Sequence, residues 1–320
     1  METLESSELS SGASIPNVLL DFIMKFPGRR AFYKYVPPDT VLDILKNQTV
    51  RYSSPLKFND PFDHQTGLHL SFDLNDFLRK LIDKFEFLAK NPAINLVDPV
   101  DSIAKLVSII REYYPTHGFP REKYDLHIEP ILAEAAHSIE QTRLEFKEHW
   151  IASLEKTRTF CVAEDRDNLL MWAHYAKDHT GAVLELWSLP EEDNAISVAR
   201  KVSYVKQPPS FFTEDEFIDD FCGVKRLDIT ELTRRSIHTK SEHWAYENEW
   251  RVYFPLSESP GRYEDLNLRA SEFKAIYFGC CANSEFIDLA LPMLAANFPS
   301  TKKFLTHKSA SGFKVNFSEI

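Results

Sequence analysis

The sequence predicts an α+β fold in which a mixed, mainly antiparallel sheet carries helices and a helical insertion. Two observations support this prediction. From about residue 74 to 156 the chain is almost free of glycine, and its apolar residues recur at helical spacing. After Thr157, strand-like segments return and are joined by short connections, which favours antiparallel pairing. Because strand patterns also precede residue 74, we expect the helical stretch to be an insertion that covers a site.

The first elements follow a short N-terminal tail. Residues 1–15 are rich in Ser and Glu, so we expect a flexible tail and then a single domain over 16–320. The run AFYKYV at 31–36 alternates aromatic and polar residues, as a half-buried strand does. The segment Pro37–Thr40 ends this strand and caps a predicted helix, TVLDILKN. TVRYSS at 49–54 is a second short strand.

The C-terminal half is expected to add most of the sheet. Helices are predicted at NLLMWAHYAK and SEFIDLALPMLAANF. The predicted strands share β-branched or aromatic residues and are RTFCVAE, TGAVLELW, ARKVSYV, EWRVYFPL, FKAIYFG, KFLTH and FKVNF. We find no repeat, low-complexity tract or linker that would enforce two independent domains.

Composition restricts the class of protein. With 320 residues and 43% apolar content, the chain can bury one large core or two smaller ones. The net charge of −11 disfavours non-specific nucleic-acid binding as a main role. The acidic N-terminus does not resemble a secretory signal, and no stretch approaches the roughly 18 apolar residues of a membrane span. The four cysteines show no disulfide framework. We therefore expect a cytoplasmic protein without membrane contact.

The first polar motif is the segment 52–63, YSSPLKFNDPFD, which combines prolines with Ser, Asn and Asp. Such a segment forms a rigid turn whose side chains satisfy their own backbone, and this structural role accounts well for Asn59, Asp60 and Asp63. The functional interpretation is that Ser53 and Ser54, at the end of a strand, face a ligand such as a ribose or an amide.

The second motif, DNLLMWAHY at 167–175, has an apolar stripe at helical spacing, which simple core packing explains. Asp167 or Asn168 is the expected helix cap. His174 and Tyr175 point in other directions from the stripe.

The third motif, WAYENEWRVYF at 244–254, has the alternation of a strand. One face, with Trp250, is expected to join the core. The other carries Glu247, Glu249, Arg251 and Tyr253, and a rigid carboxylate there suits the stabilisation of a cationic transition state. The alternative is an Arg251–carboxylate pair that merely orients the strand.

Several site classes are disfavoured by what the sequence lacks. The eleven histidines do not group at metal-ligand spacing, there is no HExxH, and we predict no metal site. No Walker loop or GxGxxG occurs, which disfavours P-loop hydrolases and Rossmann dehydrogenases. Cys161, in an apolar strand, is expected to be a small buried hydrophobic residue.

These motifs resemble a known family. The segments YKYVPPDTVLDILKN, YSSPLKFNDPFD, DNLLMWAHYA, KVSYVKQPP and HTKSEHWAYENEWRVYF are similar, in the same order, to the mainly bacterial domain-of-unknown-function family 2971, over about residues 31–280. That family label implies little about activity.

A more remote resemblance is to ADP-ribosyltransferase-fold proteins. The site of these proteins is built from three strands. The first strand carries a polar or aromatic residue, the second carries Ser or Tyr, and a later strand carries a glutamate. The chain lacks a clear His or Arg on its first strand. The residues that the resemblance assigns to the three positions are Tyr33, Lys34 or Tyr35, then Tyr52, Ser53 and Ser54, then Glu247 or Glu249.

The resemblance implies an NAD-consuming ADP-ribosyltransferase or NAD glycohydrolase, of the kind used by toxins or in phage defence. Cleaving the nicotinamide–ribose bond creates an oxocarbenium-like centre, which a fixed carboxylate stabilises; Glu249 is preferred over Glu247. Tyr35 and Tyr52 are candidates to stack on nicotinamide. The wider cofactor set includes Asn59 and Arg251, and the acceptor is left open between protein, nucleic acid and water.

Two other functions are kept as alternatives. One is a non-enzymatic ligand-binding or sensor module, in which the helical insertion provides an interface. The other is a metal-dependent hydrolase or nuclease that uses Asp60, Asp63 and Glu249 around Mg²⁺. Carboxylates that converge would favour the metal, whereas a Glu that faces an aromatic-lined slot would favour NAD.

Overall fold

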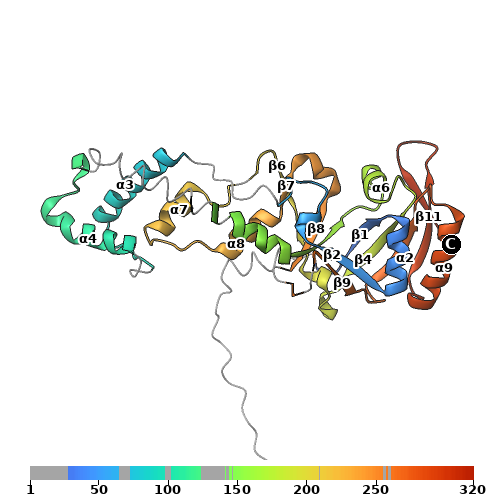
Figure 1. Ribbon diagram of the computed structural model, residues 1–320. Helices are drawn as coiled ribbons and strands as arrows, with labels where there is room; N and C mark the ends of the chain where they lie inside the picture. The colour runs from blue at the N-terminus through green and yellow to red at the C-terminus, as the bar shows by residue number, and fades with distance from the viewer. Residues whose placement is uncertain are drawn as a thin grey trace, which may run out of the picture.

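The structure is a computed structural model that describes residues 28–64, 73–97, 102–123, 141, 144–145, 147–208, 210–254, 257–258 and 261–320. Figure 1 shows an elongated molecule with the sheet at one end and helices α3, α4 and α7 at the other. The predicted tail, residues 1–15, lies outside the described residues. The division into a tail and a single domain therefore stays a prediction.

The sheet is mixed and mainly antiparallel, as predicted. Its order is β12-β11-β10-β4-β1-β3-β2-β9, with β8 on β3 and β5 on β8. Among the described strands of this sheet, β10 and β11 are the pair that runs parallel, while β6 and β7 form a separate parallel pair. The strands are β1 (Arg30–Val36), β2 (Thr49–Ser53), β3 (Arg158–Ala163), β4 (Ala182–Ser188), β5 (Arg200–Lys201), β6 (Ser203–Val205), β7 (Thr239–Ser241), β8 (Glu249–Phe254), β9 (Tyr263–Asn267), β10 (Phe273–Phe278), β11 (Lys302–Lys308) and β12 (Val315–Glu319).

Helices cover both faces of this sheet. On the first face, α2 and α9 contact each other and bury the main apolar core, which includes Phe32, Phe160 and Val252. On the second face, α6 packs Trp172 against Tyr35. The helices are α2 (Pro38–Asn47), α3 (Leu74–Lys90), α4 (Ser102–His117), α6 (Leu169–Tyr175), α7 (Glu214–Phe221), α8 (Ile229–Ile237) and α9 (Ser284–Asn297), with short 3₁₀ segments η1 (Pro55–Lys57), η2 (Pro190–Glu192), η3 (Ala195–Val198) and η4 (Glu242–Glu247).

Local sequence signals explain where two of these helices begin. Helix α2 starts at Pro38, two residues before the predicted Thr40, because a proline fits the first helical position, where no backbone donor is needed. Helix α6 follows Asn168, whose side chain accepts hydrogen bonds from the backbone of Leu170 and Met171. Asn168 is therefore the cap, one of the two residues expected.

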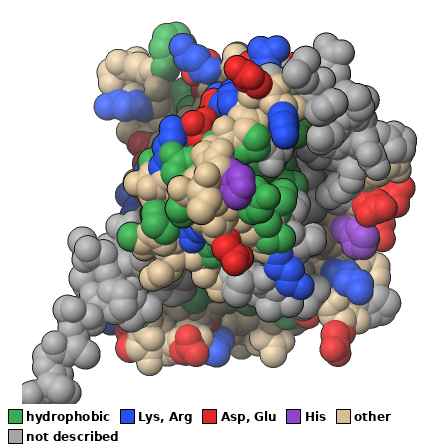
Figure 2. Space-filling model, turned by 90° about the vertical axis from the view of Figure 1, so that its left-hand side faces the viewer, with side chains coloured by type: hydrophobic (Ala, Val, Ile, Leu, Met, Phe, Trp, Pro, Cys, Tyr) green, Lys and Arg blue, Asp and Glu red, His purple; other side chains and the backbone are tan. Residues whose placement is uncertain are grey.

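The predicted helical insertion contains α3 and α4, and these build a core of their own with α7. Phe77 and Leu88 are fully buried there, and Phe77 stacks on Phe217 of α7. Figure 2 views the molecule from this end and shows hydrophobic side chains exposed among charged ones. Phe87 and Tyr113 are among the exposed hydrophobic residues of α3 and α4. Among the described residues, no helix has the length and apolar character needed to span a bilayer.

Candidate functional site

A cleft of about 430 Å³ lies on the second face of the sheet, within the size range of small-molecule sites. Strand β3 forms its floor and changes partner along its length: it pairs with β2 at Ser53–Thr159 and with β1 at Tyr33–Ala163. Lys34 bridges the gap between β1 and β3 by donating a hydrogen bond to the Cys161 carbonyl at 2.7 Å.

Most of the residues predicted from the sequence meet in this cleft. It is lined from β1 by Tyr33, Lys34 and Tyr35, from β2 and the following loop by Arg51, Ser53, Lys57, Phe58 and Asn59, from β3 by Thr159, Cys161, Val162 and Ala163, from α6 by Met171, His174 and Tyr175, and from the acidic side by Lys240, Glu247 and Glu249. The early tyrosine strand, the serine turn and the late acidic strand thus share one cavity.

The cleft has an acidic end and a basic end. Glu249 pairs with Ala163 and Ser53 pairs with Thr159, so the two ends lie four residues apart along β3. At roughly 3.3 Å per residue this separation is about 13 Å. Glu247 and Glu249 form the acidic end, and Lys57 and Arg51, near Ser53, form the basic end, where Arg51 also pairs with Asp265 through two hydrogen bonds.

The acidic end is built on a buried charge network of Asp63, Lys240, Glu247, Glu249 and Arg251. Arg251 donates to Glu249 through Nε at 2.7 Å and through Nη2 at 3.0 Å, and to Asp63 through Nη1 at 3.0 Å and Nη2 at 2.6 Å. Lys240 Nζ lies 2.6 Å from Glu247 Oε2 and 3.1 Å from Glu249 Oε2. Three carboxylates face two cations, which leaves an excess of one negative charge.

The two glutamates of the network have opposite pKa shifts. Burial raises the pKa of Glu249, but Arg251 and Lys240 outweigh burial and hold it well below its usual range. Burial raises the pKa of Glu247 above its usual value, although Lys240 opposes this shift. Glu249 is therefore ionised at neutral pH, and Glu247 is the carboxylate that takes up a proton more readily.

Glu247 does not lie on the strand where the alternation placed it. It is the last residue of η4, and Asn248 turns the chain in the left-handed region, with φ of 44°, before β8 begins at Glu249. Asparagine tolerates this conformation, so the run of alternating residues breaks there. Glu247 still reaches the cleft, where its Oε1 accepts a hydrogen bond from the Tyr175 hydroxyl. The core face of β8 is as predicted, with Trp250 and Val252 buried.

Three predicted ligand residues lie outside the cleft. Tyr52 points to the first face and stacks on Phe160 with 2% of its surface exposed, because strand alternation places it opposite Arg51 and Ser53. Ser54 is fully buried and caps η1, and its hydroxyl donates to the Leu154 carbonyl. Arg251 is fully buried behind Glu249. Tyr52 and Ser54 are thus structural, and Arg251 supports Glu249.

The remaining predicted residues keep a position on the cleft wall. Tyr35 is 4% exposed, and its hydroxyl donates to the Asp165 carbonyl, so it can offer the ring but not the hydroxyl group. Asn59 is exposed and donates to the Tyr175 hydroxyl at 3.4 Å. Burial raises the pKa of the Cys161 thiol strongly, which disfavours a thiolate nucleophile.

Sequence reasoning missed Tyr175 and Lys240 as site residues. Tyr175 had been set apart from the apolar stripe of its helix, and a tyrosine off such a stripe is a signal that it has another partner. Lys240 stands on β7, only seven residues before Glu247, and the tight 3₁₀ turn of η4 between them brings its side chain to both glutamates.

The carboxylates named for a metal site are held by other groups. Asp63 and Glu249 are bridged by Arg251, and Asp60 Oδ1 accepts from the Phe62 backbone. In the described part of the chain, no group of three or more His, Cys, Asp or Glu side chains is arranged to hold a metal ion.

In comparisons with known proteins, one family model matches a segment that contains part of this site. No curated protein and no solved structure matches the chain. Residues 171–252, which include most of α6 and the residues Lys240, Glu247, Glu249 and Arg251, match the model of a family described as a protein of unknown function (DUF2971), and this match supports the resemblance to that family.

Proposed function

We propose that the cleft binds NAD and that the chain is an NAD-consuming ADP-ribosyltransferase or NAD glycohydrolase with an ADP-ribosyltransferase-like sheet. The observation that carries this proposal is the opposite charge at the two ends of the cleft. NAD has the same asymmetry, because its nicotinamide ring is cationic and its diphosphate is anionic. The acidic end suits the nicotinamide riboside, and Lys57 suits the diphosphate, with Arg51 beside it if the diphosphate competes with Asp265 for its guanidinium.

The excess negative charge gives the acidic end a role in the reaction. When the bond between nicotinamide and ribose breaks, positive charge moves onto the ribose, and nicotinamide leaves as a neutral molecule. A fixed carboxylate in a site of low dielectric stabilises that charge more in the transition state than in the ground state. The network is already arranged for this, since its three carboxylates share two cations, Lys240 and Arg251.

The geometry suggests different roles for the two glutamates. Glu249 is held through both oxygens by Arg251, so it supplies a fixed field rather than a contact that must move. Glu247 is bound by Lys240 and Tyr175 and is the one we assign to the ribose hydroxyls. Tyr33 and Tyr35 provide aromatic surface for nicotinamide, and Ser53 and Asn59 provide hydrogen bonds.

The test is to incubate the purified chain with NAD and quantify released nicotinamide, with and without cell lysate. Glu247→Gln and Glu249→Gln should each lower turnover by about 100-fold or more. Glu242→Gln, an exposed carboxamide substitution in the same η4, is the matched control and should leave turnover unchanged. Circular dichroism of each variant separates lost chemistry from lost fold. A wild-type chain that neither binds nor turns over NAD refutes the proposal.

A ligand-binding module is the second candidate, and the Arg251–Glu249 contact favours it. A carboxylate that is fully paired on both oxygens is typical of a structural or recognition site. In that case NAD, or another ligand with the same charge asymmetry, raises the unfolding temperature while no nicotinamide is released.

A further inference from the structure

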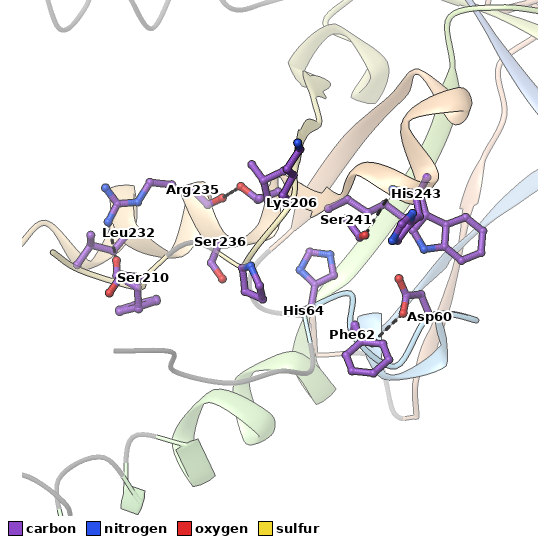
Figure 3. Close-up of a pocket in the computed structure, with 16 residues that line it drawn as sticks. Asp60, Phe62, His64, Lys206, Ser210, Leu232, Arg235, Ser236, Ser241 and His243 are labelled. Atoms are coloured by element: carbon purple, nitrogen blue, oxygen red, sulfur yellow. Dashed lines mark hydrogen bonds between the residues drawn. The ribbon is translucent and has the colours of Figure 1, made fainter. Parts of the chain in front are cut away.

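A second cavity of about 270 Å³ lies beside the cleft, on the other side of Lys240. The loop at Asp60–His64, strands β6 and β7, helix α8 and the start of η4 enclose it, as Figure 3 shows. Lys240 lines both cavities, so its side chain is a shared wall. The proposed NAD chemistry assigns no role to this second cavity.

His64 lines this cavity, and one of its two ring nitrogens is buried without a hydrogen-bond partner in the described part of the chain. Its Nε2 lies 2.6 Å from Arg251 Nη1, and because a guanidinium only donates, Nε2 must accept. The proton of the neutral ring is therefore on Nδ1, which is buried and has no partner among the described residues. Burial supports the neutral form, since it lowers the pKa of His64 to about 3. Figure 3 shows the ring between Ser236 and Ser241.

The walls and the rim of the cavity differ in character. The walls combine apolar and aromatic side chains, with Phe211 and Leu232 buried and Trp244 half-buried, and polar ones that include Asp60 and Arg235. The rim carries the exposed cation Lys206 and the exposed ring of His243. In a chain with a net charge of −11, a basic rim is a local feature that attracts anions.

We propose that this cavity is a second ligand site, for a small molecule that joins a planar heteroaromatic ring to an anionic group, as a nucleoside monophosphate does. A ring nitrogen or oxygen accepts the His64 Nδ1–H, the ring packs against the aromatic walls, and the anionic group lies at Lys206. Because Lys240 belongs to both cavities, the occupant contacts the side chain that pairs with Glu247 and Glu249. The proposal does not depend on NAD turnover.

The experiment is calorimetric titration of the full chain with AMP, adenosine and inorganic phosphate. AMP should bind about tenfold more tightly than either fragment, since it engages both the walls and the rim. Lys206→Glu, at an exposed position, should weaken AMP binding by about tenfold. Ser236→Phe, which fills the cavity, should abolish it. Lys57→Glu is the matched control: it reverses a charge in the NAD cleft, so it weakens any AMP held there and should not affect AMP bound in the second cavity.

The outcomes separate the two sites. If Lys57→Glu weakens AMP binding and Lys206→Glu does not, AMP occupies the NAD cleft and the second site is refuted. If phosphate binds as tightly as AMP, the rim holds an anion without recognition of the ring. If adenosine binds as tightly as AMP, the rim plays no part, and the proposal is overturned. A dissociation constant for AMP above about 1 mM also overturns it. If the wild-type chain binds AMP but releases no nicotinamide from NAD, only the NAD function is refuted.

Discussion

The two ends of the molecule differ in one respect: both carry exposed ion pairs, but the sheet end also buries a network of charged side chains. At the sheet end, the Arg251 and Asp63 side chains pair at 0% and 1% exposure. At the helical end, Lys90 and Glu86 pair at 51% and 27% exposure. Burying ions removes them from water and is costly, whereas exposed pairs cost and contribute little. The comparison indicates that the buried network serves a site or a specific packing arrangement, and that the helical end relies on its apolar contacts.

The largest loss of stability is expected when the cation at the centre of the buried network is removed. Arg251→Met should lower the free energy of unfolding by about 3–5 kcal/mol, because Asp63 and Glu249 would stay buried without their partner. Urea denaturation followed by circular dichroism measures the change. A loss well under 1 kcal/mol would mean that the network is easily hydrated and that the contrast between the two ends is superficial.

A smaller loss is expected when the other cation is removed. Lys240→Met should destabilise the fold by about 2–3 kcal/mol, because Glu247 loses its charged donor while Glu249 keeps Arg251. The substitution should also raise the pKa of Glu247 further, which infrared spectroscopy of the carboxyl stretch can follow. Equal losses for Lys240→Met and Arg251→Met would show that the two carboxylates depend on the cations to the same degree.

The pH dependence of stability tests the sheet end in a third way. Burial lowers the pKa of His64 to about 3 and that of His238 to about 4, whereas an unfolded histidine titrates near 6.5. Between these values the unfolded chain binds more protons than the folded chain, so stability is full above about pH 6.5 and falls as the pH is lowered towards 4.

This loss should amount to about 1 kcal/mol or more, measured as the urea midpoint at pH 7 and pH 5. Glu249 adds to the loss at still lower pH, because its depressed pKa stabilises the fold only while it is ionised. His238→Asn should reduce the difference between pH 7 and pH 5. If the His238→Asn variant keeps the full stability difference between pH 7 and pH 5, groups other than His238 cause that difference.

The contrast between local and distant contacts also explains what the sequence could predict. Alternation and helical spacing depend on neighbouring residues, so the sheet class, the core face of β8 and the Asn168 cap were predictable. The convergence of Tyr33, Ser53 and Glu249 in one cleft was expected from the family resemblance rather than from the residues themselves.

The predictions that failed depended on a single backbone conformation, on one step of strand alternation or on a short irregular turn. One left-handed residue, Asn248, moves Glu247 off the strand, and one step of alternation turns Tyr52 into the core. Lys240 meets Glu247, seven residues later, because η4 turns the chain back on itself directly after β7. Neither effect leaves a periodic pattern that a single sequence displays.

The smallest effect is expected at the helical end, and it completes the comparison. Lys90→Ala removes the partner of Glu86 on the exposed side of α3, one turn away. The urea midpoint should not shift beyond experimental error, because solvent screens the pair and alanine is itself a good helix former. Phe77→Ala on the same helix is the control, since it removes a fully buried ring from the α3–α4–α7 core and should shift the midpoint clearly. If Lys90→Ala were the more disruptive of the two, the helical end would depend on charge after all.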